Sequence, residues 1–285
     1  MSAARAFGHM LAVDARYGFR EVAGRFAAAL VLMFFVALFF KFLTMQQDGS
    51  FPRLSFIDCF VSLFGGMSEF NPTHDTNFNV PAAWLCVCLM GAFVVLSYPT
   101  QSLETIGIKQ CVAARGRWCW WLSKCAWTVV CAWVYWLLAL AVALLMAGGA
   151  EGALILSPRT ADILGFFAAA NCEAYDGVWE VALFVVGVPF ALSALYLVQL
   201  GVSVNVNPLA AFALTVALLF HAAFYLNGLS VGNYLMLARS NLVIHNGVDA
   251  VFGVGVSLVV VSAAVCVGGK AFCRHDLLGK DRLGK

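Results

Sequence analysis

The stretch FAAALVLMFFVALFFKFL, residues 26–43, decides the fold class, because its only charged residue is Lys41. A helix of this kind is long enough to cross the apolar core of a bilayer, which needs about 20 residues. Further apolar stretches follow it along the chain. Together they predict six membrane-spanning helices, at residues 26–43, 81–98, 119–147, 179–202, 208–226 and 249–269. We therefore predict an all-α integral membrane protein.

The composition supports this class. Of the 285 residues, 62% are hydrophobic and only 11% are charged, whereas soluble domains carry roughly 25% charged residues. A soluble protein of this size could not cover its surface with so little charge. The net charge is only +2 and the basic residues are spread along the predicted membrane edges. The lipid bilayer is the expected partner, and no nucleic acid is expected.

The positions of the basic residues predict the orientation. Of the 17 Lys and Arg residues, 13 fall in three places: the N-terminal segment (Arg5, Arg16, Arg20, Arg25), the second connection (Lys109, Arg115, Arg117, Lys124) and the C-terminal tail (Lys270, Arg274, Lys280, Arg282, Lys285). With six crossings, all three lie on the same side. Cytoplasmic loops carry the Lys and Arg excess, so both termini are predicted to be cytoplasmic.

The segments outside the spans each have a predicted place. Residues 1–25 interleave apolar side chains with Arg16 and Arg20, which predicts an amphipathic helix on the cytoplasmic face before the first span. Residues 270–285 form a basic cytoplasmic tail, and residues 26–269 form the transmembrane domain.

The long connections between spans are predicted to be external. The loop at residues 44–80 contains a short interfacial helix around Phe56–Phe64, and the loop at 150–178 is external as well. These two loops carry Cys59 and Cys172. The sequence leaves two alternatives for this pair: a disulfide between Cys59 and Cys172, or two free thiols.

Several catalytic motifs are absent from the sequence. Gly268-Gly269-Lys270 is followed by Ala271 and lacks the first Gly of a P-loop, so the chain has no ATP-binding motif of its own. No metal-binding pair or nucleophile motif occurs. The chain is therefore not expected to be an enzyme by itself, and no cofactor or metal site is expected in it.

The predicted spans contain few ionisable groups. Only His221 lies near the middle of one, either as a histidine hydrogen-bonded to a neighbouring helix or as a substrate contact or proton site. A membrane enzyme needs polar groups clustered at one depth, and the spans offer almost none. A transporter without an ion relay should draw its energy from another subunit.

The connection at residues 99–118 is the best candidate for contact with such a subunit. Apolar Leu103 and Ile108 alternate there with charged Glu104, Lys109 and Arg115. The segment could form a short helix parallel to the membrane that docks a cytoplasmic partner. An ordinary basic loop that obeys the orientation rule is the other reading.

Two further features could belong to a translocation path. Pro189 lies inside the fourth span, where it removes one backbone hydrogen bond and can kink the helix. The segment 227–248 contains Gly232, Asn233, Tyr234 and Arg239. It is apolar enough to re-enter the membrane from outside, although a solvated external loop is the alternative.

Taken in order, several short runs resemble the membrane (permease) subunits of bacterial type-2 ABC transporters. The resemblance covers nearly the whole chain and rests on the order and spacing of the runs. They are Tyr17-Gly18-Phe19-Arg20, Tyr98-Pro99-Thr100, Leu103-Glu104, Trp120-Trp121-Leu122-Ser123-Lys124, Gly232-Asn233-Tyr234 and Asp276-Leu277-Leu278. The length of the 150–178 loop departs from the family pattern.

The resemblance implies a six-span subunit of the bacterial cell membrane that pairs with itself or with a second permease. A separate P-loop ATPase, which would bind ATP and Mg²⁺, docks below it. In such permeases the loop after the second span forms the coupling helix, which maps onto Leu103, Glu104, Ile108, Lys109 and Arg115. The segment between the last two spans typically re-enters the membrane.

The function expected on these grounds is export of an apolar or amphipathic cargo, with His221 and Pro189 as candidate residues of the path. The alternative is a polytopic membrane scaffold or immunity-type protein that transports nothing. The sequence does not specify the substrate, the direction of transport or the pairing of subunits.

Overall fold

The computed structural model describes residues 3–48, 55–67, 69–70, 78, 80–103, 116–147, 178–241, 243–244 and 246–274. Within these residues the fold is all-helical, and the only β-type pairing is a bridge between Ser240 and Val248. In chain order the elements are α1 (Ala3–Val13), the π-helical turn η1 (Asp14–Gly18), α2 (Phe19–Asp48), α3 (Phe56–Phe64), α4 (Ala82–Leu96), α5 (Tyr98–Ser102), α7 (Arg117–Ala147), α9 (Val178–Asn205), α10 (Pro208–Phe224), the 3₁₀ turns η3 (Val231–Leu235) and η4 (Leu237–Arg239), and α11 (Ala250–Arg274).

Five helical runs in the described part of the chain are long and apolar enough to cross a membrane, which indicates a multi-pass membrane protein. They are Phe7–Leu43, Ala82–Ser102, Arg117–Ala147, Val181–Asn205 and Ala250–Arg274. The fifth predicted span, residues 208–226, is not among these five runs, because the apolar helix α10 has only 17 residues. At 1.5 Å per residue it extends about 26 Å, which is less than the roughly 30 Å of a bilayer core.

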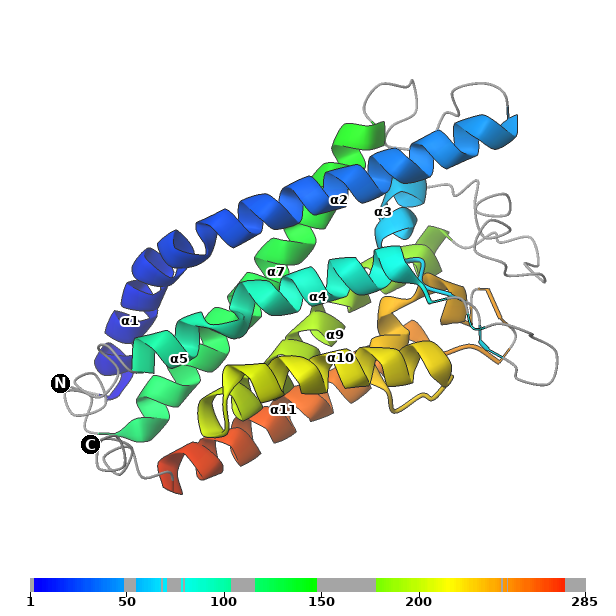
Figure 1. The fold of residues 1–285 in the computed structure, drawn as a ribbon. Helices are drawn as coiled ribbons and strands as arrows, with labels where there is room; N and C mark the ends of the chain where they lie inside the picture. Colours follow the sequence, from blue (N-terminus) through cyan, green and yellow to red (C-terminus); the bar gives the residue numbers. More distant parts are fainter. Residues whose placement is uncertain are drawn as a thin grey trace.

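The helices lie side by side in one bundle (Figure 1). The start of α1, the start of α7, the helix α5 and the end of α11 lie together at one end, which we call the termini end. The helix α3 and the turns η3 and η4 lie towards the other end, the opposite end. Helix α9 is central, since α4, α7, α10 and α11 all pack against it.

The N-terminal helix runs into the first span without a break, because α1, η1 and α2 follow one another directly. The predicted boundary at residue 25 lies inside α2. The helix bends instead at η1 (Figure 1), where the π-helical turn widens the backbone. As a result Asp14 and Gly18 face the bundle, whereas Arg16 and Arg20 are exposed.

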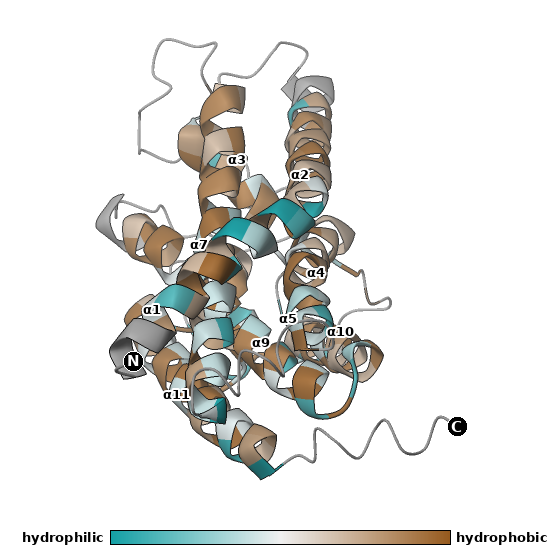
Figure 2. Cartoon of the chain, turned by 90° about the vertical axis from the view of Figure 1, so that its left-hand side faces the viewer, coloured by the Kyte–Doolittle hydropathy of each residue, from teal (hydrophilic) through white to brown (hydrophobic). Residues whose placement is uncertain are grey.

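The outer surface of the bundle is apolar. Exposed side chains include Phe35 and Phe39 on α2 and Val259 and Val267 on α11. Figure 2 views the molecule from the termini end and shows mostly apolar helices, with hydrophilic residues gathered around the start of α2 and at the end of α11. Apolar faces of this kind suit contact with lipid, and helices satisfy their own backbone groups there.

A row of hydrogen bonds joins α9 to α4 in the middle of the bundle. Three α9 side chains donate to α4 carbonyls that lie one turn apart: Tyr196 to Cys88 at 3.3 Å, Gln199 to Ala92 at 2.8 Å and Ser203 to Leu96 at 3.3 Å. All three donors are buried. Interhelical hydrogen bonds in membrane proteins contribute on average about 0.6 kcal/mol each, so the row mainly orients the two helices.

Close packing of α4 on its neighbours leads to a first prediction. A Cβ at Gly91 would overlap the hydroxyl of Tyr196 and lie 3.0 Å from Cε1 of Tyr135. We expect Gly91→Ala to lower the free energy of unfolding by about 1–3 kcal/mol, because overpacking forces side chains or helices apart. Unfolding by SDS titration in mixed micelles measures the change.

Gly201→Ala is the matched control, since Gly201 is also helical and a Cβ there meets no described atom within 4 Å. The free energy of unfolding of Gly201→Ala should rise by up to about 1 kcal/mol, because alanine has a higher helix propensity than glycine. Equal stability of the two variants would show that α4 and α9 do not approach as closely as described.

Candidate functional site

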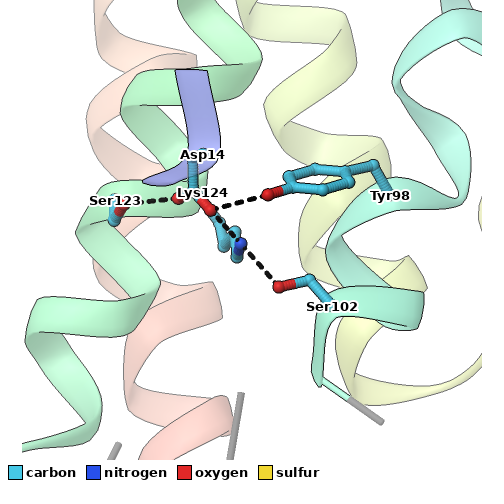
Figure 3. Close-up of polar contacts among 5 residues, drawn as sticks. All are labelled: Asp14, Tyr98, Ser102, Ser123 and Lys124. Atoms are coloured by element: carbon cyan, nitrogen blue, oxygen red, sulfur yellow. Dashed lines mark hydrogen bonds and ion pairs between the residues drawn. The ribbon is translucent and has the colours of Figure 1, made fainter. Parts of the chain in front are cut away.

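A cluster of polar side chains is buried near the termini end of the bundle. Its members, called here the Asp14–Lys124 cluster, are Asp14 from η1, Tyr98 and Ser102 from α5, and Ser123 and Lys124 from α7 (Figure 3). The Lys124 ammonium lies 2.5 Å from one carboxylate oxygen of Asp14 and donates to the Ser102 hydroxyl at 2.8 Å. Three separate helical runs therefore meet at one ion pair.

The carboxylate of Asp14 is fully engaged. Tyr98 donates its hydroxyl to Oδ1 at 2.9 Å, and Ser123 donates to Oδ2 at 2.5 Å. Asp14 is 1% exposed and Lys124 is 0% exposed. Two charges taken out of water are tolerated only when their geometry and additional hydrogen bonds compensate the lost solvation, and this arrangement supplies both.

Aromatic rings surround the ammonium group. The Nζ of Lys124 lies 4.6 Å from the ring centroid of Tyr98 and 5.3 Å from that of Trp120, distances at which cation–π attraction contributes. Tyr98 packs on Trp127 at 4.5 Å between centroids. A Cβ at Gly18 would lie 2.6 Å from Nε1 of Trp127, so only glycine lets the N-terminal helix come this close.

The chemistry of the cluster is that of a structural junction. A serine beside a lysine can form a nucleophile and its base, but such a lysine must accept the proton of the serine. Here Lys124 donates both to Asp14 and to Ser102. An ammonium held this way ties the three helical runs together.

The cluster lies where the predicted coupling loop begins. Ser102 ends α5, and Leu103 follows it, packed against buried side chains that include Met10, Trp120 and Phe272. Leu103 is thus placed beside the cluster. The other predicted coupling residues, Glu104, Ile108, Lys109 and Arg115, lie outside the described residues.

A second polar site lies at the opposite end and is centred on Arg239, which is completely buried. Its guanidinium donates to the carbonyl oxygens of Ala222 and Ala223, the latter at 2.6 Å. It also donates to the carbonyl of Met67 at 3.2 Å and to Oδ1 of Asn233 at 2.9 Å. One side chain therefore joins α10, the segment after α3 and the η3 turn.

Arg239 provides partners for two buried carbonyls in the last turn of α10. The last four carbonyls of a helix have no partner within it, and in an apolar environment each unsatisfied group costs several kcal/mol. Ala222 and Ala223 lie in the last turn of α10, which ends at Phe224. The guanidinium satisfies both carbonyls, and its charge is favourable at a helix C-terminus.

The predicted Gly232-Asn233-Tyr234 run is buried beside this site. Asn233 donates to the carbonyls of Tyr225 and Asn227 at 3.0 and 2.9 Å. A Cβ at Gly232 would lie 2.5 Å from that of Ala222, so glycine is needed for contact with α10. The structure therefore brings Gly232, Asn233 and Arg239 together, while Tyr234 packs against Gly253 of α11.

The other predicted site residues are not part of either cluster. His221 is exposed on the last turn of α10, with its ring 5.4 Å from that of Tyr225. Pro189 is buried within α9, and its carbonyl accepts a hydrogen bond from Ser193 at 2.6 Å. The structure places these two residues in different surroundings, one exposed and one buried.

Cys59 lies in α3, which forms at Phe56–Phe64 where a short helix was predicted and is buried in the bundle. Burial, with a smaller contribution from the Asp58 carboxylate, raises the pKa of its thiol to about 12. The thiol is therefore protonated at neutral pH and unreactive. Cys172 lies outside the described residues.

The sequence analysis gave Asp14 and Lys124 no functional role, although the spacing of residues around Asp14 carried a signal. The buried positions at the start of the chain recur every four residues: Met10, Asp14, Gly18, Val22 and Phe26. One acidic residue on an otherwise apolar helical face needs a buried cation as partner. Lys124, seven residues into its helix, meets that need.

No family model, no curated protein and no solved structure matches this chain. The functional argument therefore rests on the residues and on their geometry.

Proposed function

We propose that this chain is the membrane subunit of an ATP-driven exporter of the type-2 ABC class, acting as a homodimer or with a second permease. A separate P-loop ATPase would bind ATP and Mg²⁺. The observation that carries the proposal is the Asp14–Lys124 cluster. It joins the N-terminal helix to α5, which precedes residues 104–115 in the sequence, and to α7, which follows them.

The membrane topology proposed here has six passes with both termini in the cytoplasm. Five passes are the long apolar helices. The remaining pass consists of α10 together with the segment at residues 225–248, which re-enters from outside and is held to α10 by Arg239. The exposed basic residues Arg16 and Arg20 lie where η1 meets α2, and the exposed Lys270 and Arg274 lie in the last two turns of α11. The end of α11 is part of the termini end (Figure 1), so these cations support a cytoplasmic location for that end.

In the proposed mechanism, closure of the ATPase subunits pushes on the 99–118 connection. Because Ser102 and Tyr98 are bonded to Lys124 and Asp14, movement of α5 is passed to α7 and to the N-terminal helix. The spanning helices then rearrange to admit an apolar or amphipathic cargo. This step is a rigid-body transmission through a contiguous polar junction.

Affinity purification in mild detergent with mass spectrometry tests the proposal. We expect a stoichiometric P-loop ATPase to accompany the chain and to be lost, at least tenfold, in the charge-swapped variant E104K/K109E. The matched control is R20E/E21K, which swaps two exposed charges at the same end of the bundle. It should retain the ATPase.

Purification of the chain without an ATPase, under conditions where a known permease keeps its own, would instead favour the scaffold or immunity-type alternative. Equal loss of the ATPase in both charge-swapped variants would remove the 99–118 connection from the docking site.

A further inference from the structure

The central helix α9 is interrupted chemically at Pro189. Proline has no amide hydrogen, so the carbonyl of Val185, four residues earlier, cannot accept its usual hydrogen bond within the helix. Gly187 lies between these two residues, and a Cβ there would meet only the side chain of Val254, at 3.8 Å. Because Val185 and Pro189 are both buried, the free carbonyl needs a donor from elsewhere in the bundle.

Trp136 of α7 supplies that donor. Its indole N–H donates to the carbonyl oxygen of Val185 at 3.0 Å. A backbone carbonyl without a donor is costly in an apolar environment, so this bond takes the place of the one that Pro189 cannot make. Helix α9 is therefore tied to α7 at the point where its own hydrogen-bond ladder is interrupted.

A second tryptophan of α7 contacts α9 on the other side of the proline. The ring of Trp133, one turn before Trp136, lies edge-on to Phe190 with 5.4 Å between centroids. It also lies edge-on to Trp136 at 5.7 Å. Two rings of α7 therefore hold α9 immediately before and after Pro189, and the hydrogen bond to the free carbonyl comes from Trp136.

The proline divides α9 into two arms with different surroundings. The second arm, residues 190–205, carries all three donors of the hydrogen-bonded row to α4. The first arm, residues 178–188, includes Phe184 and Gly187, which line a small cavity together with Gly253 of α11. Close packing resists displacement, so an incompletely filled space beside the first arm leaves it freer to move than the second.

We propose that α9 bends at Val185–Pro189 and that the Trp136 indole is the latch that sets the bend. With the hydrogen bond made, the first arm is held against α7. With the bond broken, this arm can swing at the proline while the row to α4 stays intact, as in other hinged helices. Trp136 is thus a positioning residue. The latch requires neither an ATPase nor a cargo, so it stands apart from the proposed function.

Hydrogen exchange of the full chain in detergent micelles, read by mass spectrometry on peptides covering residues 181–188, tests the latch. Trp136→Phe keeps an aromatic ring but removes the N–H. It should raise the exchange rate of this arm about tenfold, because a buried acceptor loses its donor. Pro189→Ala restores the amide that Val185 needs within α9. In the Pro189→Ala background, Trp136→Phe should therefore raise the rate by less than about twofold.

Trp133→Phe is the matched control, because it makes the same replacement one turn away, where the side chain contacts other rings. It should leave exchange of the arm near that of the wild type. A rise in Trp136→Phe that disappears in the Pro189→Ala background supports the latch. Four outcomes overturn it. They are unchanged exchange in Trp136→Phe, an equal rise in Trp133→Phe, an equal rise in both backgrounds at residue 189, and a rise of the same size throughout the chain.

Discussion

Replacement of Lys124 by Met is expected to lower the free energy of unfolding by about 3–5 kcal/mol, because it leaves the Asp14 carboxylate buried without its cation. The free energy comes from SDS titration in mixed micelles. Arg20→Met, which removes an exposed cation near the same end, should change it by no more than about 0.5 kcal/mol.

A double-mutant cycle separates the ion pair from general packing. In Asp14→Asn/Lys124→Met the asparagine carbonyl can still accept from Tyr98, and its amide nitrogen can donate to the Ser123 hydroxyl in place of the second carboxylate oxygen. No charge is left uncompensated. We expect the double variant to recover about 2 kcal/mol or more of the loss seen in Lys124→Met. If the losses in free energy of unfolding of the two single variants simply add in the double variant, Asp14 and Lys124 are not energetically coupled. That result would contradict the ion pair described here.

The same cycle bears on the proposed function. A double variant that folds but has lost its charged junction should still bind the ATPase, because the 104–115 connection is unchanged. We expect its ATPase activity to be less sensitive to cargo than that of the wild type. Measurement of ATP hydrolysis in proteoliposomes therefore distinguishes a failure of transmission from a failure of folding.

Replacement of Arg239 by Met should destabilise the opposite end. The change leaves the carbonyls of Ala222, Ala223 and Met67 without the donor that satisfies them. Hydrogen bonds to charged groups contribute about 1.5–3 kcal/mol each, and several are lost at once. We expect the free energy of local unfolding in the segment at residues 225–248 to fall by about 2–4 kcal/mol.

Hydrogen exchange of the amides in this segment measures the local effect. Arg239→Lys is the graded comparison: it keeps the charge but cannot reach several acceptors from one planar group, so it should fall between wild type and Arg239→Met. Arg16→Met, at an exposed arginine, should leave exchange unchanged. Unaltered protection in Arg239→Met would mean that the segment is held by apolar packing alone.

The positions of the helices could be predicted from the sequence much better than their lengths or partners. Long apolar stretches predicted the helical runs closely, and α7 begins within two residues of its predicted start at 119. The fifth predicted span, residues 208–226, coincides with α10, but hydropathy could not show that this helix stops at Phe224. That end depends on an arginine 17 residues away from Ala222.

The candidate sites were only partly foreseen. The Gly232–Arg239 segment was predicted as a candidate site because it places an arginine in an apolar stretch. The structure shows which oxygen atoms accept hydrogen bonds from that arginine. Asp14 received no role, since the N-terminal segment was interpreted as an interface helix and not as part of the first span. The bend at η1 turns Asp14 inward, and no apolar pattern signals a π-helical turn.

Composition and hydropathy by themselves determined that this chain is an all-helical, multi-pass membrane protein, because a bilayer imposes the length and the apolar character of each crossing segment. Only the tertiary structure decided which polar residues meet. Asp14 and Lys124 are 110 residues apart in sequence, and their contact depends on the rotation of each helix about its axis. That rotation is set by packing, such as the contact of Gly18 with Trp127, which the sequence of one helix does not contain.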